Sequence, residues 1–375
     1  GVRDAIGFGP RAPQPPMRGS VGVTPTRPIE ERVGEDCLTL NVWSPAVADG
    51  RKRPVLVWIH GGGYVNYSAN TDLYDGTRLA RKGDVVVVSM NHRLNAFGYL
   101  YLDLYPREGK YGHFATFPVI SGRMKDGAWS VPVTIIVGNF PAPQENKQGL
   151  LTMYDVETLF HEGGHAMHYL LTTVPYGTWS GFNTEWDFVE TPSQTLEEWA
   201  WDPEVLTSLS GHYTNTSQKI PPELRDRVIA ARDAGAGHDY SRLMANSLED
   251  MEYHTAQGPV NVTTVSARIY AEMEIPQADG IHQPASFGHL MGGYDAGYYG
   301  YLWSKVYALE IADTFRHDGM TNQTTGMRFR QEILSQGNMQ DGGVLLKNFL
   351  LKEPGTDAFY KRLGIVNASG TGNKP

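Results

Sequence analysis

The pattern of hydrophobic and polar positions changes along the chain, from short apolar runs near the N-terminus to helical periodicity further on. Residues 38–43, 55–60 and 85–90 form short runs rich in β-branched residues and separated by Gly, Asp and Asn, which predicts three strands. The run Val85-Val86-Val87-Val88 has no polar alternation, which indicates a strand buried on both faces of an α/β sheet. Residues 1–34 are rich in Pro, Gly and Arg and are expected to be irregular.

The remainder of the chain is dominated by apolar residues at helical spacing. The strongest helix is predicted over residues 152–171, where Thr152 and Asp155 have the form of a capping box and Pro175 and Gly177 mark the end. One further strand is predicted over 131–137, and the class expected is α+β. Other helices are predicted over residues 196–209, 223–231, 242–254, 268–274, 296–315, 327–335 and 344–351.

The strongest chemical signal is His161-Glu162-Gly163-Gly164-His165 within the helix predicted over 152–171. Residues four apart lie about 40° apart around a helix axis, so the two imidazoles project side by side and can bind one divalent metal. Glu162 points off that face and is free to take a proton from a water that the metal activates. The alternative is a chance pattern on a core helix. Two adjacent glycines, each costing about 1 kcal/mol of helix stability, predict close approach of another backbone or of substrate.

A catalytic zinc takes three protein ligands and a water, so the two histidines need a partner. Glu190 lies 25 residues after His165, which leaves room for one turn and an antiparallel neighbouring element. An exposed or capping carboxylate is the alternative for this residue. On spacing alone it has three competitors, namely Glu185, Asp187 and Glu197.

Three other ionisable side chains lie on the same predicted helix. His168 falls on the face of His161, seven residues later, and is expected to be a core histidine or to support the ligands rather than to bind metal. Asp155 and Glu157 are expected to cap the helix or to face solvent, and the less favoured alternative is that one of them orients an imidazole.

A second constellation, residues 287–303, combines a histidine, four tyrosines and paired glycines. Tyr294, Tyr298 and Tyr301 stand at i, i+4 and i+7, so a helix would place them on one face. Taken alone, this spacing favours an aromatic core stripe over a binding site.

Composition narrows the function classes. The chain has 375 residues, 41% of them hydrophobic, which is enough for a substantial core and suggests two or three domains. A net charge of −9 argues against nucleic acid and against an anionic membrane surface, and no apolar run is long enough to span a bilayer. The single cysteine, Cys37, fits a reducing compartment, so a cytoplasmic location is predicted. No charged-then-apolar leader follows Gly1, so a processed chain or a fragment is expected.

The first hundred residues resemble one enzyme family. Residues 35–43, the turn His60-Gly61-Gly62-Gly63-Tyr64 and the run Asn91-His92-Arg93-Leu94 are similar to the opening of a type-B carboxylesterase of the α/β-hydrolase fold, over about residues 5–100. Glycines after a strand let backbone N–H groups converge on an anionic oxygen. The family's nucleophile lies in a Gly-x-Ser-x-Gly turn, which occurs nowhere in this sequence. Residues 1–97 are therefore predicted to form a β-rich, partial hydrolase segment without a nucleophile.

The rest of the chain resembles another family. The resemblance begins with the run Tyr101-Leu102-Asp103-Leu104-Tyr105-Pro106-Arg107-Glu108-Gly109-Lys110-Tyr111-Gly112-His113 and continues to about residue 365. Over this range the sequence is similar to the thimet oligopeptidase and neurolysin family of zinc peptidases. Residues 98–375 are thus expected to be the C-terminal part of its catalytic domain, mostly helical and zincin-like with a small β-sheet. Members usually carry phenylalanine at the position of Gly163.

This second resemblance implies roles for particular residues. The third ligand of one Zn²⁺ per chain is the glutamate of Asp187-Phe188-Val189-Glu190, beside His161 and His165, and Glu162 is the general base. Tyr301 would donate to the oxygen that becomes negative in the reaction. The family's glycine-rich substrate loop corresponds here to the constellation at residues 287–303. In this loop His289 and Tyr294 would contact the peptide, and Tyr298 would lie near it. The glycines Gly292, Gly293 and Gly297 would let the loop close.

The function expected is therefore that of a zinc metalloendopeptidase acting on short peptides. One alternative is a metal-binding but inactive fusion, whose ligands assemble while the substrate channel does not. A less favoured alternative is a carboxylester hydrolase. The sequence does not indicate an oligomeric state.

Overall fold

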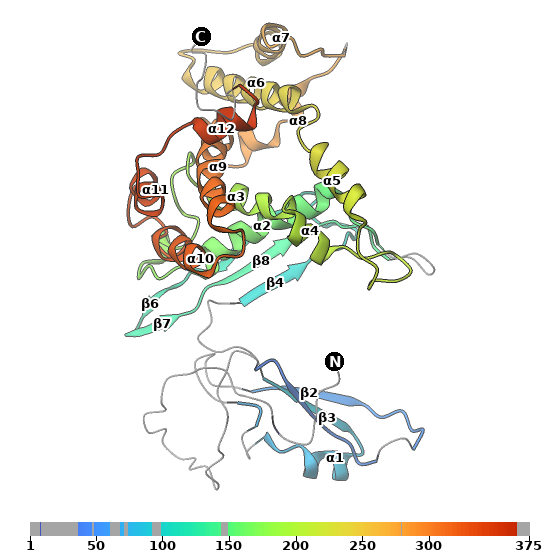
Figure 1. Cartoon of the computed structure of the whole chain (residues 1–375). Helices are drawn as coiled ribbons and strands as arrows, with labels where there is room; N and C mark the ends of the chain where they lie inside the picture. Colours follow the sequence, from blue (N-terminus) through green and yellow to red (C-terminus); the bar gives the residue numbers. More distant parts are fainter. Residues whose placement is uncertain are drawn as a thin grey trace. The chain divides into compact units, whose positions relative to one another are not determined.

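The computed structural model describes residue 8 and residues 37–46, 49–60, 68–70, 74–91, 99–143, 149–278 and 280–365. The chain divides into two compact units, Gly1–Ala96 and Phe97–Pro375, each of which is described by itself (Figure 1). The glycine turn 61–64, the run 92–94 and nearly all of the irregular arm 1–34 lie outside the described residues.

The described residues of the first unit form a three-stranded mixed sheet and one short helix. Its strands are β1 (Leu40–Trp43), β2 (Val55–Ile59) and β3 (Val86–Met90), in the order β1-β3-β2, with α1 (Thr77–Gly83) before β3. The three predicted strands are therefore confirmed. The central strand β3 alternates between buried and partly exposed positions, so burial on both faces was predicted wrongly. In β2 every side chain is at least 44% exposed.

The second unit contains more strands than the sequence predicted. Of its strands only β8 (Val133–Val137) was expected, and it lies between β4 (Tyr99–Asp103), which is parallel to it, and β5 (Ala115–Ile120), which is antiparallel. β6 (Arg123–Lys125) and β7 (Ala128–Ser130) form a hairpin. Asp126 and Gly127 close it with φ of 50° and 78°, the left-handed conformation that a two-residue turn requires.

Helices are the main secondary structure of the second unit. α2 (Met153–Leu170) begins with the predicted capping box, in which the Thr152 hydroxyl accepts from the Asp155 N–H and the Asp155 carboxylate accepts from the Thr152 N–H. The other helical elements are η2 (Gly177–Trp179), α3 (Thr191–Ala200), α4 (Pro203–Leu209), α5 (Pro222–Ala230), α6 (Ala236–Thr255), α7 (Val262–Glu272), α8 (Gln283–Ser286), η3 (Gly288–Met291), α9 (Gly300–Asp318), α10 (Gln323–Phe329), the π-helical turn η4 (Arg330–Leu334), α11 (Gly342–Leu350) and α12 (Asp357–Arg362).

Two predicted helices differ from the structure in an informative way. The helix expected over 196–209 is two helices, because Asp202 caps α4 and Pro203 occupies its first position. The helix expected over 296–315 begins only at Gly300, because Ala296 has a φ of 58° and interrupts the helical path. The α+β class itself is confirmed for the described residues, whereas a partial hydrolase fold for the first unit stays a prediction.

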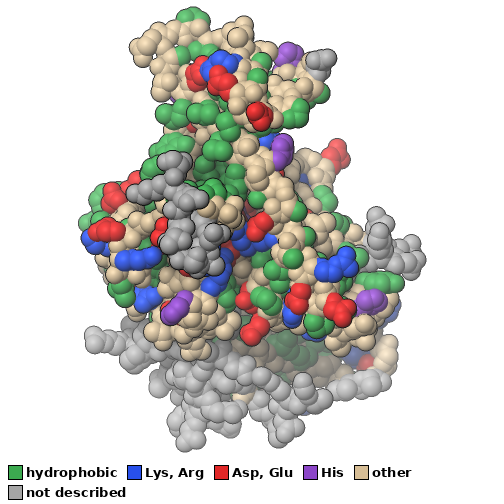
Figure 2. All heavy atoms as spheres, turned by 45° about the horizontal axis from the view of Figure 1, so that its top comes forward, with side chains coloured by type: hydrophobic (Ala, Val, Ile, Leu, Met, Phe, Trp, Pro, Cys, Tyr) green, Lys and Arg blue, Asp and Glu red, His purple; other side chains and the backbone are tan. Residues whose placement is uncertain are grey.

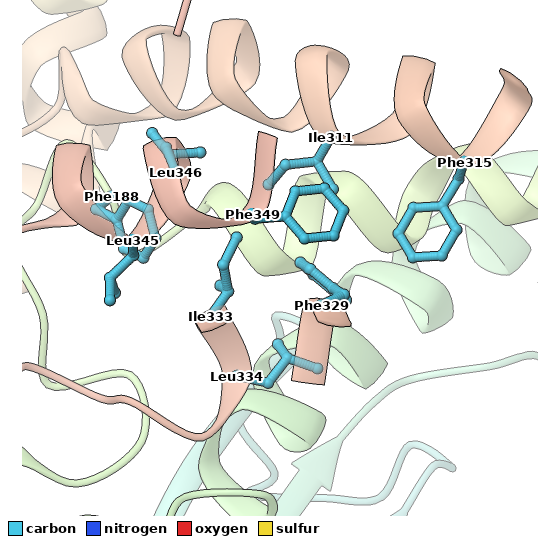
Figure 3. Packing of buried hydrophobic residues seen from close by; sticks show 9 residues of the cluster. All are labelled: Phe188, Ile311, Phe315, Phe329, Ile333, Leu334, Leu345, Leu346 and Phe349. Carbon is cyan, nitrogen blue, oxygen red and sulfur yellow. The ribbon is translucent and has the colours of Figure 1, made fainter. Parts of the chain in front are cut away.

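The main core of the second unit lies where α9, α10, η4 and α11 meet, with Phe188 contributed by the segment before α3 (Figure 3). Phe315, Phe329 and Phe349 pack ring against ring, with centroids 5.6–6.0 Å apart. Since Phe188 is 1% exposed and lies two residues before Glu190, this core fixes the position of the candidate ligand. The nine buried members are Phe188, Ile311, Phe315, Phe329, Ile333, Leu334, Leu345, Leu346 and Phe349.

On the surface, acidic and basic side chains of the described residues are interspersed, and the face drawn in Figure 2 shows no large patch of one sign. Across the residues that the structure describes, none of the helices is both long enough and apolar enough to traverse a bilayer.

Candidate active site

The candidate site is built where α2 and α3 lie side by side. A Cβ at Gly164 would lie 2.5 Å from the Ser193 Cα and 2.7 Å from the Pro192 carbonyl oxygen, so only glycine permits this helix separation. The predicted close approach of another backbone is therefore confirmed at Gly164. At Gly163 a Cβ would meet nothing within 4 Å. Because α3 follows Glu190 directly, the close pairing brings that carboxylate against the face of α2.

The structure brings the three predicted metal ligands together. Glu190 Oε2 lies 3.2 Å from His161 Nε2 and 3.0 Å from His165 Nε2. Ligand atoms at zinc-bond length in a tetrahedron are about 3.3 Å apart. The two carboxylate–imidazole distances match this value to within a few tenths of an ångström, and all three donor atoms lie within 4.8 Å of one another, so the donor set suits one zinc ion. Across the described part of the chain, no other group of three His, Cys, Asp or Glu side chains has metal-binding spacing.

Both oxygens of Glu190 are held by further hydrogen bonds. Ser193 Oγ donates to Oε2 at 2.8 Å, and the Tyr294 hydroxyl donates to Oε1 at 2.7 Å. The side chain is almost fully buried, which opposes ionisation, yet the neighbouring His165 and His161 hold the pKa of Glu190 well below its usual value. The carboxylate is therefore charged and oriented, as a metal ligand must be.

A second carboxylate orients the His161 ring through the nitrogen that does not face Glu190. Glu197 Oε1 lies 2.8 Å from His161 Nδ1, and Lys305 Nζ donates to Glu197 Oε2 at 2.6 Å. Burial disfavours the imidazolium, but hydrogen bonds and charge from Glu190 and Glu197 raise the pKa of His161 well above 6.5. Sequence reasoning considered Glu197 only as a competing ligand. It missed Lys305 because the two residues are 108 positions apart and no local pattern links them.

Glu162 lies beside the ligands and has one defined partner. Thr116 Oγ1, on β5, donates to its carboxylate oxygen Oε2 at 2.7 Å. Glu162 is only slightly exposed, and it lines the same cleft as His161 and His165. Thr116 was missed because β5 was not predicted.

An aromatic cluster of Tyr294, Tyr301 and His289 also lines this cleft. The rings of Tyr294 and Tyr301 stack with centroids 5.1 Å apart, and the His289 ring lies 5.5 Å from the first and 5.7 Å from the second. Burial and the charge of Glu190 raise the pKa of both tyrosines, so each keeps its proton and can donate it to a hydrogen bond.

The tyrosines meet in a different way from the one the spacing predicted. Only Tyr301 is on α9, whereas Tyr294 and Tyr298 belong to the turns before it, so a single helical face was the wrong interpretation. Gly293 has a φ of 94°, a conformation in which other residues are strained, and this turns the chain just before Tyr294.

The three candidate ligands, Glu162 and the aromatic cluster line one cleft of about 970 Å³. Tyr298 and Gly293 are not among its lining residues. His168 is also away from the cleft: it is fully buried, and neither ring nitrogen has a hydrogen-bond partner within the described structure. The predicted residues that do line the cleft are His161, Glu162, His165, Glu190, His289, Gly292, Tyr294 and Tyr301.

Comparison with known proteins gives two family matches. The profile described as Peptidase family M3 matches residues 82–365, and the profile described as Carboxylesterase family matches residues 1–114. Both resemblances inferred from the sequence are thereby confirmed.

Among curated proteins, the Thimet-like oligopeptidase of Dictyostelium discoideum is 40% identical over 274 residues, which cover 72% of this chain and 41% of that protein. Oligopeptidase A of Escherichia coli (strain K12) is 37% identical over 276 residues, which cover 72% and 40%. The chain thus spans about two fifths of the length of these relatives. A solved structure of PZ peptidase A with an inhibitor superimposes with a TM-score of 0.47 at 14% identity, over 70% of this chain and 42% of that one.

Proposed function

This chain belongs to peptidase family M3, and from that premise we propose that it is a zinc-dependent endopeptidase that hydrolyses short peptides. The observation that carries the proposal is the convergence of two imidazoles on one buried carboxylate, each within hydrogen-bond distance of it, with Glu162 beside them in a cleft. The oligopeptidase names of the relatives suggest the substrate class.

The zinc ligands would be His161, His165 and Glu190. When bound, zinc supplies Lewis acidity toward water and toward the carbonyl of the peptide bond. Ser193 and Tyr294 fix the rotamer of the Glu190 carboxylate, and Glu197 fixes the ring of His161 through Nδ1. The chain's own contribution at this stage is a ligand set held in place before substrate arrives.

Glu162 is the group that moves protons. Its carboxylate takes a proton from the attacking water and later delivers a proton to the leaving amine nitrogen. The Thr116 hydroxyl, which donates to Oε2, leaves the other carboxylate oxygen available for this transfer. The Tyr301 hydroxyl donates a hydrogen bond to the substrate oxygen on which negative charge develops. The raised pKa of Tyr301 keeps this hydroxyl protonated.

We assign no step of this reaction to the first unit. Its glycine turn lies outside the described residues, and the sequence contains no Gly-x-Ser-x-Gly nucleophile turn. A cytoplasmic location also stays a proposal, based on the single cysteine.

The proposal is tested with the full chain and a set of internally quenched fluorescent peptides. Cleavage that chelation abolishes and added zinc restores is the expected result. Zinc binding without cleavage of any peptide would show instead a metal-binding but inactive chain. Hydrolysis of a simple aryl ester that survives chelation, but not a serine-directed inhibitor, would contradict the proposal in favour of an esterase.

A further inference from the structure

The turn that carries Tyr294 is held by a residue outside the cleft. Residues 292–299 connect η3 to α9, and they contain Gly293 and Ala296 in the left-handed conformation. Non-glycine residues adopt this conformation only where their surroundings enforce it. The turn therefore needs an external support.

That support is the carboxylate of Asp250 on α6. Its Oδ1 accepts from the Ala296 N–H at 2.8 Å and its Oδ2 from the Tyr298 N–H at 2.9 Å, so one side chain binds both amides that flank Gly297. Asp250 is 0% exposed, and His254 Nδ1 lies 2.9 Å from Oδ1. A buried carboxylate that satisfies two backbone donors is a strong anchor, since charged acceptors form shorter and stronger hydrogen bonds.

The anchored segment determines where two cleft tyrosines lie. Tyr294 is two residues before Ala296 and donates to Glu190, while Tyr301 is three residues after Tyr298 and stacks on Tyr294. Asp250 itself is absent from the cleft lining. Its influence on the site therefore passes through the backbone of the turn.

We propose that Asp250 is a positioning residue, which fixes the 294–298 turn so that Tyr294 and Tyr301 are placed over the metal ligands. The proposal rests on the proposed peptidase function for its kinetic consequences, but its structural part does not. Asparagine at this position is nearly isosteric, yet it has only one acceptor oxygen for two N–H donors. Asp250→Asn therefore loosens the turn without changing the volume of the side chain.

The first test is hydrogen exchange of the peptide covering residues 292–300, followed by mass spectrometry. Exchange is expected to be several-fold faster in Asp250→Asn and unchanged in Glu249→Gln. Glu249 is a matched control, because it is equally buried on the same helix while its polar neighbours are Ser266 and Tyr253. Unchanged exchange in Asp250→Asn would overturn the proposal. If Asp250→Asn does not fold, Asp250→Glu, which keeps the charge but displaces the oxygens, is judged by the same criterion.

The second test is a double-mutant cycle on peptide cleavage. Asp250→Asn is expected to lower kcat about tenfold to a hundredfold at unchanged zinc content, because small misplacements of catalytic groups cost about that much. In the Tyr294→Phe, Tyr301→Phe background the same change is expected to cost less than threefold. An equal loss in both backgrounds would overturn the proposal. If the unchanged chain cleaves no peptide, the peptidase proposal fails and the exchange measurement alone decides the role of Asp250.

Discussion

The two sides of the cleft are held by different kinds of structure. On the metal side, His161 and His165 come from one regular helix, and Glu190 lies immediately before the first residue of the neighbouring one. On the tyrosine side, Tyr294 comes from a turn whose backbone is fixed by hydrogen bonds to Asp250, which lies on α6, 46 residues before Ala296.

This difference predicts that mutations on the two sides have different effects. The metal side is rigid because helix packing at Gly164 and paired charges around Glu197 set the positions of its donors before any ligand binds. The tyrosine side depends instead on a few hydrogen bonds between Asp250 and the backbone of a segment rich in glycine. Mutations of the metal ligands or of Glu197 should therefore change metal binding, whereas mutations of Glu162 and Tyr301 should change the rate at unchanged zinc content.

The largest effect is expected from Glu162→Gln. Glutamine cannot take up a proton, so kcat should fall by about two to four orders of magnitude. Zinc content should stay at that of the unchanged chain, because Glu162 is not among the ligands. The measurements are metal analysis and cleavage of a quenched peptide. Glu157→Gln, one turn earlier and outside the cleft lining, is the control. Zinc loss in Glu162→Gln would contradict the separation of base from ligands.

Tyr301→Phe tests the other side. Loss of the hydroxyl should lower kcat by about two orders of magnitude, as does removal of a donor to a developing oxyanion elsewhere, and KM should change little. Steady-state kinetics measures both constants. Tyr299→Phe serves as the control, because that ring is 36% exposed and does not line the cleft. A rise in KM with unchanged kcat would mean that Tyr301 only binds substrate.

Glu197→Gln should weaken the metal side without removing a ligand. The change takes away the charged partner of His161 Nδ1, which should lower zinc affinity about tenfold to a hundredfold. Competition with a chromophoric chelator measures this affinity. Glu204→Gln, an exposed residue at the start of α4, should leave it unchanged. An unaltered affinity in Glu197→Gln would show that the contact has no role in holding the metal.

The smallest effect concerns stability. Burial, aided by His165, lowers the pKa of His168 to about 3, whereas the unfolded chain titrates near 6.5. Between these values the unfolded chain binds a proton that the folded chain does not, so stability falls as pH decreases from about 6.5 toward 3. His168→Leu should reduce this slope and raise Tm by a few degrees, since the replaced ring has no partner. Thermal melts of the metal-free protein at a series of pH values test this prediction. His317→Gln, which replaces an exposed histidine, is the control and should leave the slope unchanged.

The metal side was more predictable from sequence than the tyrosine side, for a physical reason. The spacing of His161 and His165 on a helix is a local rule, and the Thr152 capping box fixed where that helix begins. Glu190 could be separated from Glu185 and Glu197 only through the family resemblance, because its position depends on the packing of α3 against α2.

The tyrosine side and the small sheet were harder to predict, because they depend on contacts between residues far apart in the sequence. The start of the helix predicted over 296–315 was wrong because Ala296 is in the left-handed conformation. No sequence pattern signals a positive φ at alanine. By contrast, Asp126-Gly127 is a well-known hairpin signal, and reading it would have revealed β6 and β7. β5 contains Pro118 next to a register shift, so its role in pairing with β8 was hidden.

The central claim is that His161, His165 and Glu190 hold one metal ion, and zinc bound per chain after dialysis tests it most directly. Glu190→Ala should retain far less zinc than the unchanged chain at the same free zinc concentration. Glu185→Ala, which removes an exposed carboxylate from the same segment, should retain one zinc per chain. Full retention of zinc by Glu190→Ala, at unchanged affinity, would contradict the account.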